Sequence, residues 1–308
     1  MTLQQLEYII AVDNLRHFAK AAEQCRVTQP TLSAMIQKLE EELNVKIFDR
    51  GKQPVCPTDI GNCILQQARE VLVQANQIKN IIEEQQHSLS GTFRMGILPT
   101  IAPYLLPRFF PQLTKKYPQL DIRVSEMKTE DIKKALQLGD IDGGVVAGLD
   151  NMEEFVQTPL LYDQFYAYVS RDCSLFRHER IRTSDVTGQQ LWLLDEGHCF
   201  RDQLMRFCQL ETARASKQAY HLGSMETFMR MVESGRGITF IPELAVLQLS
   251  AAQRELVRPF AIPMPTRRLV MLTGKNFVRT TLLNALATAI RESVPREMLS
   301  LKGTQQVV

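Results

Sequence analysis

The sequence has no long hydrophobic run, no marked excess of one charge and no clustered cysteines. Its apolar stretches are well short of the ~18 residues that a membrane-spanning helix needs. The first residues do not show the basic segment followed by an apolar one that is typical of a secretory signal. We therefore expect a cytoplasmic protein that has no membrane partner and keeps its thiols reduced.

The six cysteines do not favour a metal site. They contain no C-x-x-C pair, and the chain has only five histidines, so we expect neither a metal nor a cofactor. We interpret Cys25, Cys63 and Cys173 as small buried side chains, because free cysteine behaves as a small apolar residue. Cys199 and Cys208 differ from these, because they lie nine positions apart in one short segment.

The 308 residues, with 44% hydrophobic and 23% charged side chains, are enough for two or three globular domains. Residues 1–58 have the pattern of short helices that end in a turn. Thr28 occupies an N-cap position and Pro30 lies in the first helical turn, where its missing N–H costs little. The apolar residues that follow form one helical stripe: Leu32, Ile36, Leu39 and Leu43.

The polar face of this helix suits the edges of bases and the phosphates of a major groove. A turn with basic residues follows it, as in a wing that touches the DNA backbone. The candidate DNA-binding residues are Thr28, Gln29, Thr31, Ser33, Arg50 and Lys52. Because residues 1–58 carry seven basic and seven acidic side chains, an ordinary helical bundle is the alternative.

The run "FAKAAEQCRVTQPTLSAMIQKLEEELNVKIFDR", followed by Thr58 and Gly61, closely resembles the winged helix-turn-helix of LysR-type transcriptional regulators. The wing departs from the family pattern at Gln53 and at Cys56–Pro57. The resemblance implies that double-stranded promoter DNA and RNA polymerase are partners, and that the protein is a regulator and not an enzyme.

Residues 59–89 are predicted to form a linker helix. Its apolar positions repeat every 3.5 residues, as in a coiled coil: Ile64, Ala68, Val71, Ala75, Ile78 and Ile82. This spacing favours a homodimer or a homotetramer, and a paired helix suits the two half-sites of an operator. The alternative is a single amphipathic helix that packs on its own domain.

Residues 90–308 alternate between strand and helix patterns, which predicts a parallel sheet flanked by helices. A strand is expected over 189–197. We expect two lobes with a ligand cleft between them. The first holds about 90–162 and 268–300, and the second about 163–267. This region resembles the LysR-type regulatory domain, which is akin to periplasmic binding proteins and in most members senses a small metabolite.

The pair Cys199 and Cys208 cannot bond within a regular helix. If 199–208 is helical, their Cα atoms lie ~13 Å apart, whereas a disulfide needs about 7 Å or less. A bonded form would therefore require the helix to unwind, as in a switch. Cys199 has the surroundings of a reactive thiol, since a helix start, His198 and Arg201 all lower a thiol pKa. Two unrelated thiols on one helix are the alternative.

The segments "LLDEGHCFRDQLMRFC" and "GILPTIAPYLLP" resemble the peroxide-sensing members of the LysR family. The resemblance implies that Cys199 is the peroxidatic cysteine and Cys208 the resolving cysteine. It implies that a set of polar residues shapes the peroxide pocket: Thr100, Thr129, His198 and Asp202. It also implies that Arg268, with Arg267 as its neighbour, supplies positive charge to the Cys199 thiolate.

Three functions follow as hypotheses. The first is a regulator that responds to hydrogen peroxide and activates oxidative-stress genes. The second is a LysR-type regulator that responds to a small metabolite and whose cysteines are incidental. The third is a thiol peroxidase, which would leave the N-terminal module unexplained.

Overall fold

The computed structural model describes residues 1–85, 89–148, 152–194, 199–208 and 224–308. The chain separates into two compact units. The first contains Met1–Gln86 and Gln137–Asp140, and the second contains His87–Leu136 and Ile141–Val308. Of the helices described in these ranges, none is both long and apolar enough to cross a membrane.

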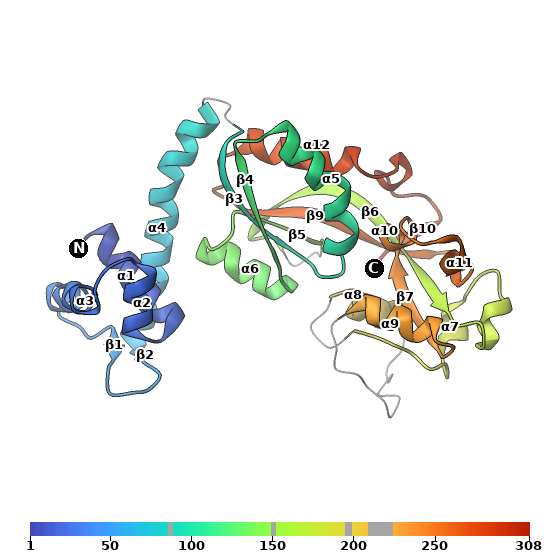
Figure 1. Cartoon of the computed structure of the whole chain (residues 1–308), viewed down its shortest axis with the longest axis horizontal. Coiled ribbons are helices and arrows are strands. Elements are labelled where there is room, and N and C mark those ends of the chain that lie inside the picture. The colour runs from blue at the N-terminus through green and yellow to red at the C-terminus, as the bar shows by residue number, and fades with distance from the viewer. Residues whose placement is uncertain (86–88, 149–151, 195–198, 209–223) are drawn as a thin grey trace. The chain divides into compact units, whose positions relative to one another are not determined.

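The first unit begins with three helices, α1 (Leu3–Leu15), α2 (Phe18–Gln24) and α3 (Gln29–Leu43). The strands β1 (Phe48–Asp49) and β2 (Cys56–Pro57) pair antiparallel as a short wing, and α4 (Asp59–Gln85) follows (Figure 1). The predicted helix-turn-helix and its hairpin are therefore confirmed.

Local signals set the start of α3 and of α4. Thr28 caps α3 through its hydroxyl, which accepts a hydrogen bond from the Thr31 amide, and Pro30 lies in the first turn. Thr58 does the same for α4, where it accepts from the amide of Gly61. A β-carbon on Gly61 would lie 2.1 Å from the carbonyl oxygen of Ile47, so only glycine fits between α4 and the wing.

The apolar core of this unit contains most of the predicted stripe of α3. Leu32, Ile36 and Leu39 are fully buried, but Leu43 is 37% exposed because α3 ends there and nothing packs over its last turn. The apolar stripe predicted for α4 is likewise buried at one end and exposed at the other. Ala68 is buried in the core, whereas Ile78 is 65% exposed.

The second unit is built on eight described strands with the order β4-β3-β5-β9-β6-β7, with β10 beside β9 and β8 beside β6. The strand bounds are β3 (Gly91–Ile97), β4 (Leu120–Glu126), β5 (Gly143–Ala147), β6 (Phe155–Val169), β7 (Ile238–Pro242), β8 (Val257–Pro259), β9 (Met264–Gly274) and β10 (Gln305–Val307).

Helices and short turns connect these strands. Their bounds are α5 (Ala102–Lys116), α6 (Thr129–Leu138), η1 (Ser174–Arg177), α7 (Thr183–Val186), α8 (Cys199–Phe207), α9 (Met225–Glu233), α10 (Glu243–Val246), α11 (Ala251–Arg254), α12 (Thr280–Glu292) and η2 (Arg296–Met298). Helices α5 and α12 pack side by side (Figure 1). On the sheet, a β-carbon at Gly144 would lie 2.4 Å from Ile132 of α6, so glycine allows close helix–sheet packing.

Two long strands join the lobes of this unit. Residues 155–164 of β6 pair with β9, apart from Leu160 at a bulge, and the last five residues pair with β7 and β8 in the second lobe. The predicted two-lobe α/β architecture is confirmed. The prediction of a parallel sheet is wrong, since β3 is parallel to β4 and β5 but β9 and β6 run antiparallel to their neighbours. These two strands cross between lobes instead of returning through a helix.

The strand expected over 189–197 is also wrong for its described part. Leu191 makes a single isolated bridge to Ile238, and no strand is formed up to residue 194. Residues 195–198 lie outside the described ranges.

Candidate functional site

The start of α3 presents the polar face that the sequence predicts. Thr28, Gln29 and Thr31 are exposed and Ser33 is half-buried. The hydroxyls of Thr28 and Thr31 lie 2.8 Å apart and share a hydrogen bond. Exposed polar groups at a helix N-terminus are suited to phosphate contacts.

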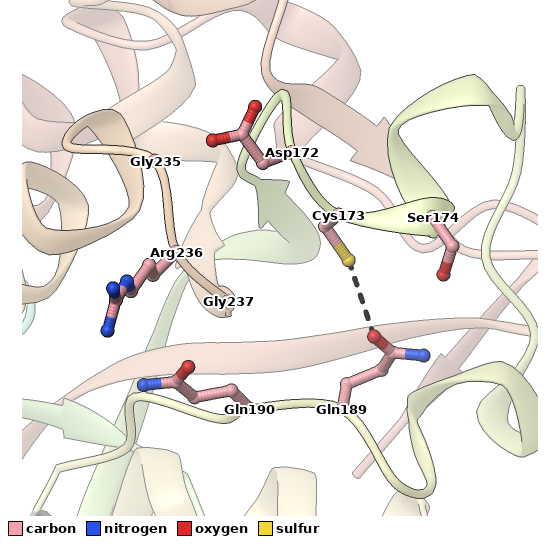
Figure 2. A pocket seen from close by; sticks show the side chains of 8 residues that line it. All are labelled: Asp172, Cys173, Ser174, Gln189, Gln190, Gly235, Arg236 and Gly237. Atoms are coloured by element: carbon pink, nitrogen blue, oxygen red, sulfur yellow. Dashed lines mark hydrogen bonds between the residues drawn. The ribbon is translucent and has the colours of Figure 1, made fainter.

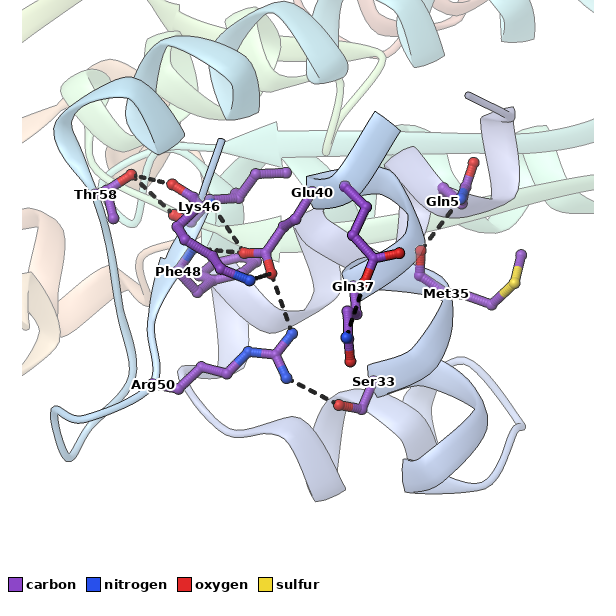
Figure 3. Close-up of polar contacts among 11 residues, drawn as sticks. Gln5, Ser33, Met35, Gln37, Glu40, Lys46, Phe48, Arg50 and Thr58 are labelled. Atoms are coloured by element: carbon purple, nitrogen blue, oxygen red, sulfur yellow. Dashed lines mark hydrogen bonds and ion pairs between the residues drawn. The ribbon is translucent and has the colours of Figure 1, made fainter. Parts of the chain in front are cut away.

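The two basic residues of the wing have different surroundings. The Lys52 ammonium lies 3.6 Å from Asp49 and is largely exposed. The guanidinium of Arg50 instead contacts α3, where it donates to Glu40 and to Ser33 (Figure 3). Arg50 thus belongs to the face of α3 and not to the tip of the wing.

The cysteine segment is helical, as the sequence predicts. Helix α8 begins at Cys199 and ends at Phe207, and the Cys208 amide continues it by donating to the carbonyl of Leu204 at 2.9 Å. Cys208 is 4% exposed, and burial raises the pKa of its thiol to about 12. The side chain of Cys199 and all of His198 lie outside the described residues.

A fully buried cation stands beside the first turn of α8. The Arg267 guanidinium donates to the Asp163 carboxylate at 2.9 and 3.0 Å, and to the Thr100 hydroxyl at 2.9 Å. Its Cζ lies 5.2 Å from the ring centroid of Phe200 and 5.7 Å from that of Phe165. Phe200 directly follows Cys199, so the Arg267 guanidinium packs against the first turn of α8.

Asp163 and Arg267 are direct cross-strand partners on β6 and β9. Burial raises the pKa of Asp163, and the adjacent guanidinium opposes that shift. The other carboxylate oxygen accepts a hydrogen bond from the Leu244 amide at 3.0 Å. A buried charge pair needs this complete set of partners.

The two predicted arginines lie on opposite faces of β9. Neighbouring residues of a strand point to opposite faces, so Arg268 faces away from the cluster that Arg267 forms. Arg268 is half-buried and donates to the side-chain oxygen of Gln157 at 3.2 Å. Arg267, predicted only as the neighbour, is the residue that meets Thr100 and Phe200.

The other predicted pocket residues are only partly brought together. Thr129 begins α6 and is buried, and its hydroxyl has no hydrogen-bond partner among the described residues. Asp202 lies on α8 but is exposed, so the structure does not place it in the buried cluster.

Gln203 on α8 is a buried polar residue that sequence reasoning missed. Its side-chain amide is fully buried and donates to the main-chain oxygen of Val308 at 2.7 Å. Asp163 was missed as well. It stands in the apolar run "LLYDQFYAYV", and a carboxylate in such a run is a signal of a buried partner.

The remaining cysteines are less buried than predicted. Cys63 is exposed on α4, and Cys25 and Cys173 are half-buried. The thiol of Cys173 donates to the side-chain oxygen of Gln189 at 3.3 Å, in a polar hollow of about 410 Å³ on the second lobe (Figure 2). Within the described part of the chain, no three His, Cys, Asp or Glu side chains are grouped as metal ligands.

Two family models match the chain. Residues 3–62 match the bacterial regulatory helix-turn-helix protein of the lysR family, and residues 86–295 match the LysR substrate binding domain. The chain belongs to the LysR family of bacterial regulators. As a LysR-family member, it carries the DNA-binding module of that family at its N-terminus.

Two relatives of this LysR-family chain are named as regulators of transcription. It is 33% identical to the "Hydrogen peroxide-inducible genes activator" of Dickeya chrysanthemi, over 98% of this chain and 99% of the relative. It is also 33% identical to the "DNA-binding transcriptional dual regulator OxyR" of Escherichia coli K12, over 94% and 95% of the two chains.

Solved structures agree with this LysR-family fold. A full-length OxyR variant from Pseudomonas aeruginosa is 34% identical and covers 94% of this chain and 98% of its own, with a TM-score of 0.77. OxyR from Porphyromonas gingivalis is 47% identical over 71% of this chain and 99% of its own, with a TM-score of 0.67. A hydrogen-peroxide-bound OxyR mutant from Corynebacterium glutamicum is 25% identical, covers 95% and 92%, and has a TM-score of 0.63.

Proposed function

We propose that this LysR-family protein is a transcriptional regulator that responds to hydrogen peroxide. Its relatives named for peroxide induction match over nearly the whole chain. The observation that carries the proposal in this chain is helix α8, which begins at Cys199 and is followed by the buried thiol of Cys208, with the buried Arg267 against its first turn.

In the proposed reaction Cys199 is the peroxidatic residue. Its thiolate attacks one oxygen of hydrogen peroxide, the O–O bond breaks, and the departing hydroxide takes a proton to become water. The product is a sulfenic acid on Cys199. The guanidinium of Arg267 and the hydroxyls of Thr100 and Thr129 would stabilise the thiolate and the leaving hydroxide, with His198 as a further pocket residue.

Cys208 then resolves the sulfenic acid. Its sulfur attacks the Cys199 sulfur, a disulfide forms, and a second water leaves, so that two thiols and one peroxide give one disulfide and two waters. In the helical form the two Cα atoms are ~13 Å apart by helix geometry, too far for a disulfide. Bond formation therefore requires α8 to unwind, which is the proposed switch.

The switch would act on DNA through the rest of the chain. We divide the chain into a DNA-binding domain at 1–58, a linker at 59–89 and a regulatory domain at 90–308. The exposed isoleucines in the second half of α4 suit pairing with a second copy. Promoter DNA and RNA polymerase would be its partners at oxidative-stress genes, in the cytoplasm where thiols are kept reduced.

The test combines mass spectrometry with a DNA footprint before and after hydrogen peroxide. Wild-type protein is expected to gain a Cys199–Cys208 bond and a changed footprint. Cys199→Ser is expected to bind DNA with a footprint that peroxide does not alter. Cys173→Ser, which removes another thiol of the same unit, should respond as the wild type does.

Three outcomes would contradict the proposal. An undiminished response of Cys199→Ser would make the cysteine pair incidental. A footprint that changes with an organic metabolite and not with peroxide would support the metabolite-sensing function. Sustained consumption of peroxide with thioredoxin as reductant would support a thiol peroxidase.

A further inference from the structure

Glu40 is a fully buried carboxylate beneath the wing. It lies on α3, and its Oε1 accepts hydrogen bonds from the amides of Ile47 at 2.8 Å and Phe48 at 3.3 Å. These two residues lead into β1. A carboxylate inside a protein is tolerated only with such donors, so Glu40 fixes the entry of the wing to α3.

The second oxygen of Glu40 faces two basic side chains. Its Oε2 lies 3.3 Å from Nη2 of Arg50 and 3.5 Å from Nζ of Lys46. The Lys46 side chain is 70% exposed and its contact is long, whereas Arg50 is 39% exposed. The carboxylate thus holds Arg50 more firmly than Lys46, because an exposed ammonium is well solvated.

Two further contacts orient the Arg50 guanidinium, of which Figure 3 shows the one to Ser33. Its Nη1 donates to the Ser33 hydroxyl at 3.2 Å, and its Cζ lies 5.1 Å from the ring centroid of Phe18. The three partners come from α2 and α3. They place the guanidinium on the polar face of α3, beside a residue expected to meet DNA.

We propose that Glu40 is a positioning residue for DNA binding, and that it acts by holding Arg50 beside Ser33 as a phosphate-binding group. A guanidinium has five N–H donors in a fixed plane and binds phosphate through two of them. An orientation set before binding saves the entropy of ordering a long side chain. The inference rests on the DNA-binding role of the family, and it assigns to Glu40 a part in that role although Glu40 itself is buried and acidic.

Glu40→Gln separates positioning from folding. Glutamine has the same shape and keeps an oxygen for the Ile47 and Phe48 amides. Its NH₂ group replaces the oxygen that faces Arg50, and two donors then meet. The variant is expected to keep the fold of the unit and to release the guanidinium from α3.

The experiment is a double-mutant cycle in the full-length protein. Wild type, Glu40→Gln, Arg50→Gln and the double variant are titrated by fluorescence anisotropy into a labelled duplex selected from random DNA with the wild type. Arg50→Gln is expected to weaken binding about tenfold and to lower the slope of log affinity against log salt by about 1. Glu40→Gln should weaken binding about three- to tenfold, and should add nothing once Arg50 is glutamine.

Equal effects of Glu40→Gln with and without Arg50 would overturn the proposal, as would an unchanged affinity of Glu40→Gln. Glu40→Asp gives a second route if Glu40→Gln fails to fold. It keeps the charge but shortens the side chain that reaches Arg50, so it should weaken DNA binding only while Arg50 is present. Lys52→Gln is the matched control. It removes a wing cation that does not contact Glu40, so its effect should be the same with Glu40 or Gln at that position.

Discussion

Asp163 and Arg267 face each other across β6 and β9 as a fully buried ion pair, with Nη2 2.9 Å from Oδ2. The pair joins the point where β6 crosses between lobes to the first turn of α8. The stability of the regulatory unit and the proposed stabilisation of the Cys199 thiolate therefore depend on the same guanidinium.

Arg267→Met is expected to destabilise the regulatory unit by about 3–5 kcal/mol, because Asp163 is left buried without its cation. Arg268→Met removes one half-buried contact to Gln157 and should cost about 1 kcal/mol or less. Urea unfolding followed by the fluorescence of the buried Trp192, the single tryptophan, measures both. Equal midpoints for the two variants would show that the pair does not carry the stability.

The Cys208 thiol predicts a loss of stability at alkaline pH. Its pKa is raised from 9.0 to about 12 in the folded protein, so the unfolded chain releases the proton first. Stability is full below pH 9 and falls as the pH rises from 9 towards 12. The free energy of unfolding measured between pH 8 and 10.5 should fall less steeply in Cys208→Ala than in wild type. The same slope in both proteins would contradict the raised pKa.

The proposed pairing of two copies through α4 predicts weaker association when its exposed isoleucines are replaced. Burying both Ile78 and Ile82 is worth about 3 kcal/mol or more, so Ile78→Lys with Ile82→Lys should raise the dissociation constant at least about 100-fold. Sedimentation velocity over a concentration series measures this. Asn76→Lys adds a cation at an exposed position of α4 that faces away from the stripe and is expected to leave such pairing unchanged.

The hydrogen bond from Gln203 to Val308 is expected to raise the free energy needed to open α8. Gln203→Ala removes the hydrogen bond to Val308 and should make opening of α8 easier by about 1–2 kcal/mol. Alkylation of the buried Cys208, followed by mass spectrometry, should then be about tenfold faster. Gln248→Ala removes a similar bond, to the Tyr104 carbonyl, away from α8. An equal rate of alkylation in both variants would show that the Gln203 contact does not restrain the helix.

The parts of the fold set by local signals could be predicted from the sequence. Thr28 and Pro30 mark the start of α3, and the alternation of patterns gives two α/β lobes. The choice between Arg267 and Arg268 could not be predicted, because it depends on the register of β9 against β6. Adjacent strand residues point to opposite faces, so a shift of one position exchanges their roles.

Gln203 could not be predicted for a related reason. Its partner Val308 lies 105 positions further along the chain, and no local pattern connects the two. The burial of Leu43 was overestimated because a stripe in the sequence does not show where its packing partner ends.

The contact between Gln203 and Val308 bears on how the protein is handled in the laboratory. Val308 also donates from its amide to Thr266, one residue before Arg267. An affinity tag or fluorescent reporter attached at Val308 would lie beside α8, the helix that begins at Cys199 and leads into Cys208. A label attached at this position is expected to disturb peroxide dose–response curves, so labels for imaging or pull-down are better placed away from α8.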